Sequence, residues 1–240
     1  MARFQIVSDL HLENPKAYDL FEIAPKAPYL ALLGDIGNVR DDGFLLFIED
    51  QLRKFEIVFL VMGNHEPFHS SWLDVREKLK RFSDDITRKG AQMQNTKSGS
   101  HNLGKFVLLD QTRYDLAPDL TVLGCTFHSK VSDLQEERVT EIARSNPHHR
   151  IVIFTHHSPT VAPLAVDPAH AKSPISSAFA TDLAGEACWE KPQVRLWGFG
   201  HTHYNCDFTD SRTGKRIVAN QRGYYFSQAK VFEPEKVISI

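Results

Sequence analysis

The chain has 240 residues, of which 42% are hydrophobic and 24% are charged, and its formal net charge at pH 7 is -2. This length and composition are ordinary for one globular unit, so we expect a single domain over residues 1–240. The near-zero charge gives no overall attraction to nucleic acid or to an acidic membrane surface, and no apolar run approaches the roughly 18 residues of a membrane span.

Short apolar runs recur along the chain and are predicted to be strands. In chain order they are Arg3–Val7, Tyr29–Leu33, Ile57–Val61, Leu120–Leu123, Ile151–Phe154, Val194–Trp197 and Arg216–Ala219. Their lengths suit strands rather than helices. Several are continuously apolar, which indicates a sheet that is covered on both faces.

Between these runs, apolar residues at helical spacing predict helices within Phe44–Leu52, Trp72–Ile86 and Val131–Arg144. The polar, turn-rich segment Gln92–Gly104 is predicted to be a loop. Pro159–Pro174 contains four prolines and no clear period, which indicates a long irregular loop. Loops of that length often carry function.

The start of the chain and its cysteines bear on the compartment. The N-terminal sequence enters a strand pattern without a long apolar stretch or a cleavage site, so we expect no secretory signal. Cys125, Cys188 and Cys206 are few, odd in number and scattered. They argue against a disulfide framework and for a reducing compartment, so we expect a cytoplasmic protein.

Side chains that can bind a metal follow five of the predicted strands directly. The five blocks are Asp9-Leu10-His11, Gly34-Asp35, Gly63-Asn64-His65-Glu66, His156-His157 and Gly200-His201-Thr202-His203. Ligands of open α/β sheets bind outside the carboxyl ends of the strands, so five such ends in one sheet would bring these side chains together. A glycine before the polar residue lets the backbone turn sharply and approach the site.

The types of side chain indicate the kind of metal. Imidazole, carboxylate and amide oxygen suit divalent ions such as manganese, iron, zinc or nickel, and the absence of thiolates argues against a structural zinc site. Six or seven ligands exceed the needs of one tetrahedral ion and suit two ions roughly 3.5–4 Å apart that share a carboxylate. Asp9-Leu10-His11 or Gly34-Asp35 alone is better explained by a turn, and Gly63–Glu66 alone is explained equally well by one. The pair His201 and His203 is stronger evidence, because two histidines at this spacing after a strand rarely serve only packing. All five blocks in this order favour a metal centre.

In this order the blocks resemble the calcineurin-like metallophosphoesterase superfamily, whose pattern is D-x-H, G-D, G-N-H-[DE], a histidine after a strand, and G-H-x-H. The resemblance covers residues 9 to 203. It implies an α/β fold, a four-layer α/β/β/α sandwich with two mixed β-sheets, around a dinuclear centre. It also implies that one ion is held by Asp9, His11, Asp35 and His203, and the second by Asp35, Asn64, His156 and His201. Asp35 would then bridge the two ions, and His65 would stand beside them without ligating either.

The chain departs from the Ser/Thr protein phosphatases of this superfamily. It lacks an Asp-Arg-Gly after the second block and has Met62 where those enzymes carry an arginine. These departures argue against a phosphoprotein as the main substrate. The segment Asn220–Tyr224 resembles one found in small stand-alone esterases of the superfamily, so Arg222 is a candidate phosphate contact.

We therefore expect dinuclear-metal-dependent hydrolysis of phosphoric esters, with a phosphodiester as the favoured small-molecule substrate. A hydroxide that bridges the two metal ions would be the nucleophile, and His65 would be the general acid. Asp35 or Glu66 would be the carboxylate partner of His65, although Glu66 suits a solvated or helix-terminal role equally well. His128 could line the cleft, and His157 is expected to lie outside the ligand set.

Three other functions remain as alternatives. A phosphomonoesterase, including one for phosphoproteins, is the nearest. A nuclease is disfavoured by the neutral charge and by the lack of a basic stretch interleaved with aromatic residues. A non-catalytic interaction scaffold is disfavoured because His65 and every expected ligand are present.

Overall fold

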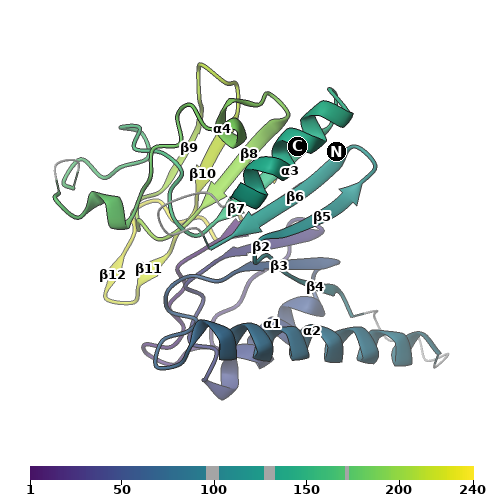
Figure 1. Cartoon of the computed structure of the whole chain (residues 1–240). Helices are drawn as coiled ribbons and strands as arrows, with labels where there is room; N and C mark the ends of the chain where they lie inside the picture. The colour runs from purple at the N-terminus through teal and green to yellow at the C-terminus, as the bar shows by residue number, and fades with distance from the viewer. Residues whose placement is uncertain (96–102, 127–132, 171–172) are drawn as a thin grey trace.

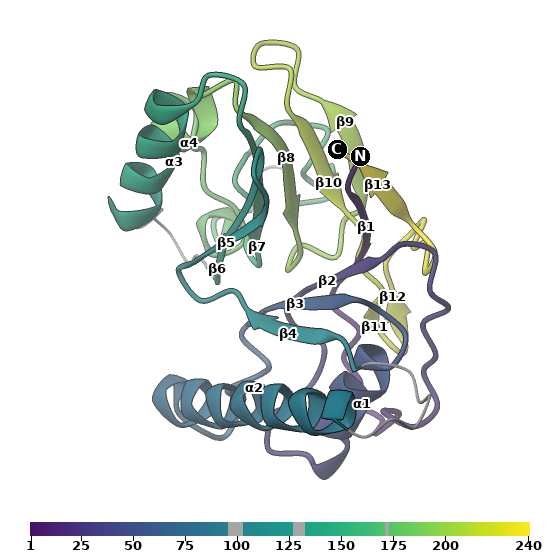
Figure 2. The ribbon, with the colours of Figure 1, turned by 90° about the vertical axis from the view of Figure 1, so that its right-hand side faces the viewer.

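Two mixed β-sheets face each other in the middle of the molecule, and helices cover the outer face of each (Figures 1 and 2). The computed structural model describes residues 1–95, 103–126, 133–170 and 173–240. The predicted α/β fold with four layers is therefore confirmed. Within the described residues, every helix is too short or too polar to cross a lipid bilayer.

The first sheet has the strand order β13-β1-β2-β3-β4. Strands β1 to β4 run parallel to one another, and β13 is antiparallel to β1 at the edge. The strands are β1 (Arg3–Val7), β2 (Tyr29–Leu33), β3 (Ile57–Val61), β4 (Lys105–Leu108) and β13 (Val237–Ser239).

The second sheet has the order β5-β6-β7-β8-β10-β9, with a parallel centre and an antiparallel strand at each edge. Its strands are β5 (Thr112–Ala117), β6 (Leu120–Cys125), β7 (Arg150–Thr155), β8 (Val194–Phe199), β9 (Cys206–Thr209) and β10 (Arg216–Ala219). A separate antiparallel hairpin joins β11 (Gly223–Tyr224) and β12 (Ser227–Gln228).

Helices form the two outer layers. The first sheet is covered by α1 (Asp42–Leu52) and α2 (Trp72–Asn95), and the second by α3 (Asp133–Ser145) and the short α4 (Ala187–Glu190) (Figure 2). A single 3-10 turn, η1 (Ser176–Ala178), lies in the long connection between β7 and β8.

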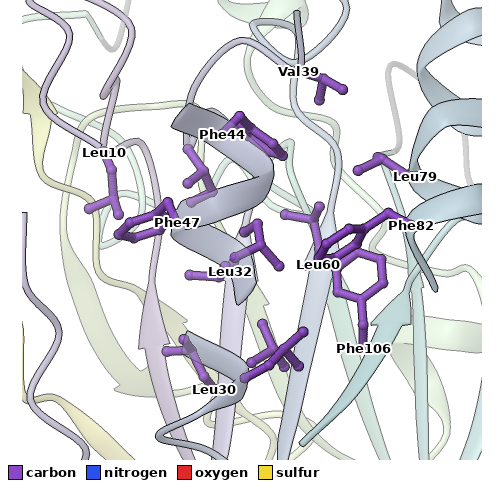
Figure 3. Close-up of a cluster of buried hydrophobic side chains, with 14 of the residues drawn as sticks. Leu10, Leu30, Leu32, Val39, Phe44, Phe47, Leu60, Leu79, Phe82 and Phe106 are labelled. Carbon is purple, nitrogen blue, oxygen red and sulfur yellow. The ribbon is translucent and has the colours of Figure 1, made fainter. Parts of the chain in front are cut away.

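Each space between two layers holds its own apolar cluster. Along β2, Leu30 and Leu32 belong to the cluster against α1 and α2, whereas Ala31 and Leu33 belong to the cluster between the two sheets. Figure 3 shows the first cluster, where Phe44 and other side chains of α1 and α2 meet the strands. A third cluster fills the space between the second sheet and α3 and α4. Strands buried on both faces must be apolar at every position, which explains the continuous apolar runs.

Some sequence-based boundaries were wrong. Helix α2 continues to Asn95, so the first four residues of the predicted loop Gln92–Gly104 are helical. These residues include no glycine or proline, and their polar composition is compatible with an exposed helix surface. The predicted helix Val131–Arg144 is α3, whose described part begins at Asp133. The described residues of Pro159–Pro174 form neither helix nor strand, as predicted.

Candidate metal centre

The five polar blocks follow β1, β2, β3, β7 and β8 and meet at one end of the stacked sheets. The expectation that one sheet supplies all five ends was wrong, because three belong to the first sheet and two to the second. Backbone hydrogen bonds tie the blocks together. The amide of His201 donates to Oδ1 of Asp9 at 3.1 Å, and the amide of His65 donates to Oδ1 of Asp35 at 2.8 Å.

Asp9, His11 and His203 form the first group of donors. Nε2 of His203 lies 3.2 Å from Oδ1 of Asp9 and 3.0 Å from Nε2 of His11. Asp9 and His11 are buried, and their ligating atoms converge on one point. This arrangement could hold one cation.

The second group contains Asp35, Asn64, His156 and His201. Nε2 of His156 lies 3.5 Å from Oδ2 of Asp35 and 3.2 Å from Oδ1 of Asn64. Its other nitrogen, Nδ1, donates to the carbonyl of Leu33 at 2.9 Å, which leaves the Nε2 lone pair free for a metal. The donor atoms of Asp35, His156 and His201 lie within 4.8 Å of one another, so this group could hold a second cation.

His201 is oriented by the long β7–β8 connection. Its Nε2 donates to the carbonyl of Ala178 at 3.2 Å, so Nδ1 carries the lone pair. Burial, followed by the charge on His156, lowers the pKa of His201 to about 4. His201 is therefore neutral near pH 7, as a metal-binding imidazole must be.

The donor chemistry fits divalent cations. Asp9 and Asp35 are 0% and 2% exposed, and buried carboxylates require a cation or dense hydrogen bonding to offset their desolvation. Among the described residues, no arginine or lysine side chain pairs with either carboxylate; the partners are histidines. The imidazole nitrogens and anionic oxygens of both groups are therefore suited to metal ions.

The backbone at these blocks is strained. Five of the seven predicted ligands have a positive φ although none is glycine, and they are Asp9 (52°), His11 (47°), Asp35 (52°), His201 (71°) and His203 (49°). Each such residue costs on the order of 1–3 kcal/mol, and such strain concentrates at functional sites. The turns that follow the strands therefore adopt a backbone that places the predicted ligands, at a cost in local stability.

Two glycines allow the blocks to come this close. A Cβ on Gly63 would collide with Oδ1 of Asp35 and lie 2.6 Å from Cε1 of His156. A Cβ on Gly200 would lie 2.6 Å from Oδ2 of Asp9. The prediction that glycine permits close approach is confirmed at both positions.

His65 stands beside both groups and has a carboxylate partner that the sequence analysis missed. Its Nδ1 lies 2.8 Å from Oε1 of Glu13, and its Nε2 lies 4.0 Å from Oδ2 of Asp35. Burial alone lowers the pKa of His65, but the Glu13 hydrogen bond and the nearby carboxylates outweigh it and raise that pKa. The same Oε1 lies 3.3 Å from Nδ1 of His11. In the sequence, Glu13 is marked only by its spacing, because Asp9, His11 and Glu13 occupy every second position.

Glu66 has a different role from the ones expected. It is fully buried, and its carboxylate accepts backbone N–H groups of Asp35 at 3.0 Å, Ile36 at 2.8 Å and Gly63 at 2.6 Å. Burial and the charge on Asp35 raise its pKa. Glu66 is therefore neither solvated nor the partner of His65; it joins the turns after β2 and β3.

The remaining candidates lie outside the two donor groups. Nη1 of Arg222 donates to the carbonyl of Leu10 at 3.1 Å, and its guanidinium lies over the ring of Phe21. His157 is buried with its ring 4.1 Å from that of His201. His128 lies outside the described residues.

Comparisons with known proteins show the family and the fold of the chain. The sequence model of the family described as calcineurin-like phosphoesterase matches residues 2–205. The chain is 26% identical to the uncharacterized protein L509 of Acanthamoeba polyphaga mimivirus, over an alignment that covers 100% of this chain and 97% of that protein.

Two solved structures share the fold. Phosphopantetheinyl hydrolase from Mycobacterium tuberculosis has a TM-score of 0.57 and 17% identity, covering 93% of this chain and 90% of that chain. A dimetal phosphatase from Danio rerio has a TM-score of 0.57 and 13% identity, covering 91% of this chain and 86% of that chain. At these identities the likeness concerns the fold alone.

Proposed function

The chain belongs to the calcineurin-like phosphoesterase family, and from that premise we propose that it is a phosphodiesterase that uses two divalent metal ions. One observation carries the proposal. Among the described residues, donors converge in three groups: Asp9, His11 and His203; Asp35, His156 and His201; and His11, Glu13 and His65. We assign the ions to the first two groups, because in the third the imidazole of His65 is held by the carboxylate of Glu13. This is the set of parts that ester hydrolysis needs: a metal pair and a proton donor.

We propose that the ions divide the predicted ligands between them. Asp9, His11 and His203 would hold one ion, Asn64, His156 and His201 would hold the other, and Asp35 would lie between them. Nitrogen and oxygen donors of this kind suit manganese, iron, zinc or nickel. When bound, two such ions lower the pKa of a water molecule toward about 7 and neutralise charge on the phosphoryl oxygens.

His65 would supply the proton for the leaving group. Its Nδ1 is occupied by Glu13 at 2.8 Å, so Nε2 is the nitrogen that can reach a leaving oxygen. Glu13 stays ionised, because hydrogen bonds from His11 and His65 outweigh the effect of burial and lower its pKa to about 2. An ionised Glu13 favours the protonated form of His65, which is the form a general acid must start from.

The charge around the centre supports a diester over a monoester. Among the described residues, no arginine or lysine side chain pairs with a predicted ligand or with His65. A monoester near pH 7 carries close to two negative charges, whereas a diester carries one. Ligands that pair with no lysine or arginine side chain within the described residues are better matched to the smaller charge. A phosphomonoesterase remains the alternative.

We also propose a small-molecule substrate and a cytoplasmic location. None of the three cysteines, Cys125, Cys188 and Cys206, forms a disulfide, which is consistent with a reducing compartment. The net charge of -2 offers no general attraction to nucleic acid.

The test is metal quantification coupled to a substrate panel. Protein stripped with a chelator is reloaded with each ion and assayed on a bis-aryl phosphate, a mono-aryl phosphate and single-stranded DNA. We expect about two ions per chain and the fastest turnover on the bis-aryl ester. Faster turnover of the mono-aryl ester would favour the alternative, and a chain that binds no transition metal would remove the proposal.

Asp35→Ala tests the shared ligand separately. Because Asp35 would serve both ions, we expect the variant to lose both. Asp167→Ala, in the long β7–β8 connection, is a control that should keep both ions. Retention of one full-strength site in Asp35→Ala would contradict the bridging role.

A further inference from the structure

Three partly exposed aromatic rings stack on three different histidines of the candidate centre. The pairs are Phe68 on His65 (centroids 5.8 Å apart, planes at 14°), Tyr224 on His11 (4.2 Å, 28°) and Phe179 on His201 (5.0 Å, 25°). The aromatic residues are 54%, 44% and 38% exposed. The proposed mechanism uses none of them, and rings left open to solvent beside a reaction centre are candidates for substrate contact.

Two of these rings border His65. The ring of Phe68 is nearly parallel to that of His65, and the ring of Tyr224 lies 6.0 Å from it at 54°. The Tyr224 hydroxyl lies 3.4 Å from Nε2 of His65. That nitrogen is the one free to give a proton, because Glu13 occupies Nδ1. A leaving group that takes its proton from Nε2 of His65 would lie beside Phe68 and Tyr224.

The backbone holds both rings in place. The amide of Gly223 donates to the carbonyl of Asp9 at 2.9 Å, and the amide of Arg222 donates to the carbonyl of Ser8 at 3.0 Å, so the hairpin that carries Tyr224 is attached to the first metal-binding block. On the other side, the side chain of Asn38 donates to the carbonyl of Phe68 at 2.9 Å. Walls that are fixed before binding lose little entropy when a ligand enters.

Building on the proposed phosphodiesterase activity, we propose that Phe68 and Tyr224 form a subsite for the leaving group and select esters whose leaving group carries a flat aromatic ring. Hydrolysis forms one P–O bond from water and breaks the P–O bond to the leaving group, whose oxygen takes the Nε2 proton of His65. A planar ring can stack on an aromatic wall, whereas a puckered alkyl group cannot. The substrate class is therefore an aryl or heteroaryl phosphodiester.

The experiment compares two methyl phosphodiesters on the metal-loaded protein. One has a phenyl leaving group, and the other has a fluoroalkyl leaving group of matched acidity. We expect a higher kcat/KM for the phenyl ester. Phe68→Leu and Tyr224→Leu should each reduce this preference about threefold to tenfold, whereas Tyr224→Phe, which keeps the ring, should retain it. Phe226→Leu is the matched control, because Phe226 lies in the same hairpin and is 90% exposed.

A binding measurement tests the subsite without turnover. Titration calorimetry compares methyl phenylphosphonate with methyl cyclohexylphosphonate, which differ in the flatness of the ring. Neither compound can release its ring, because the ring is joined to phosphorus by a P–C bond, and the methoxide of the remaining ester is a poor leaving group. Wild-type protein should bind the phenyl compound about threefold to tenfold more tightly, and Phe68→Leu should remove the difference. Metal content is measured for every variant. If Tyr224→Leu changes metal binding by disturbing His11, the Phe68→Leu variant still tests the subsite.

The outcomes separate this subsite from the proposed activity. Failure of the metal-loaded wild type to cut either ester removes the phosphodiesterase proposal, and the phosphonate titration then still tests the subsite. Equal phosphonate affinities, or variants that slow both esters by the same factor, would overturn the aromatic subsite while leaving the phosphodiesterase in place.

Discussion

Glu13 links the proposed proton donor to a proposed metal ligand. One oxygen of its carboxylate lies 2.8 Å from Nδ1 of His65 and 3.3 Å from Nδ1 of His11. Such a contact sets which nitrogen of each imidazole is protonated and how the ring is oriented. At the scale of single residues, the proposed chemistry therefore depends on a side chain outside every recognised block.

Replacing His65 with Asn tests the proton donor. We expect turnover of a diester with a poor leaving group to fall roughly 10²- to 10⁴-fold, because the leaving oxygen loses its proton source. Kinetic assays and elemental analysis measure turnover and metal content, and metal content should not change. His148→Ala, at an exposed histidine, is the control. Loss of metal in the His65 variant would make His65 a ligand and refute the assignment.

Glu13→Gln tests the carboxylate. The neutral amide holds the imidazolium less well, so we expect kcat on a poor leaving group to fall roughly 10- to 100-fold. The loss should be smaller on a nitrophenyl ester, whose leaving oxygen needs little protonation. Glu22→Gln, at an exposed position, is the control. Equal losses on both esters would indicate a purely structural role for Glu13.

At the scale of elements, the functional parts are the turns that end the strands. Asp9 and Asp35 both adopt a φ of 52°, and the buried carboxylate of Glu66 receives three backbone amides from the turns after β2 and β3. These hydrogen bonds offset part of the cost of the strained turns. The strands are rigid, and the turns that follow them place the proposed ligands.

Gly63→Ala tests this packing of turns. The added methyl group would collide with Asp35 and approach His156, so we expect metal affinity to fall by about 10- to 100-fold or more, measured by calorimetric titration. Gly90→Ala in α2 is the matched control, because a Cβ there meets nothing within 4 Å. The free energy of unfolding of that variant should be about 0.5–1 kcal/mol higher than that of the wild type, and its metal affinity should be unchanged. Normal metal binding by Gly63→Ala would show that the turns can relax.

At the scale of the whole molecule, the candidate centre joins the two sheets. Asp9 and Asp35 follow strands of the first sheet, and His156 and His201 follow strands of the second. The unfolded chain cannot present these groups together, so metal binding favours the folded state. A metal bound at the candidate centre would therefore couple the two halves of the sandwich as well as serving the proposed chemistry.

Metal removal tests that coupling. Free metal at 100 times its dissociation constant would stabilise the fold by about 2.7 kcal/mol for each ion bound, and for a chain of this size each such contribution raises Tm by roughly 5–10 °C. Differential scanning calorimetry with and without a chelator measures the shift. The Asp35→Ala variant should show only a small rise in Tm when metal is added. A wild-type Tm that does not respond to metal would contradict the coupling.

The central strands could be predicted from sequence, whereas the outer ones could not. Strands β1, β2 and β3 have the predicted bounds, because burial on both faces makes most of their residues apolar; the polar exceptions in β1 are the exposed Arg3 and the buried Gln5. Strands β5 and β9 were missed because they are edge strands in which more and less exposed residues alternate, which gives no apolar run.

The sequence by itself determined the order of the five polar blocks and the alternation of strands and helices, because these follow from residue type and periodicity along the chain. The resemblance carried by those blocks implied the family and its four layers. Only the tertiary structure decided that two sheets share the site, that Glu13 holds His65, and that Phe68 and Tyr224 flank its free nitrogen. These contacts join residues whose separation in space is set by turns and sheet packing. Spacing in sequence carries no information about which side chains such packing brings within a few ångströms of each other.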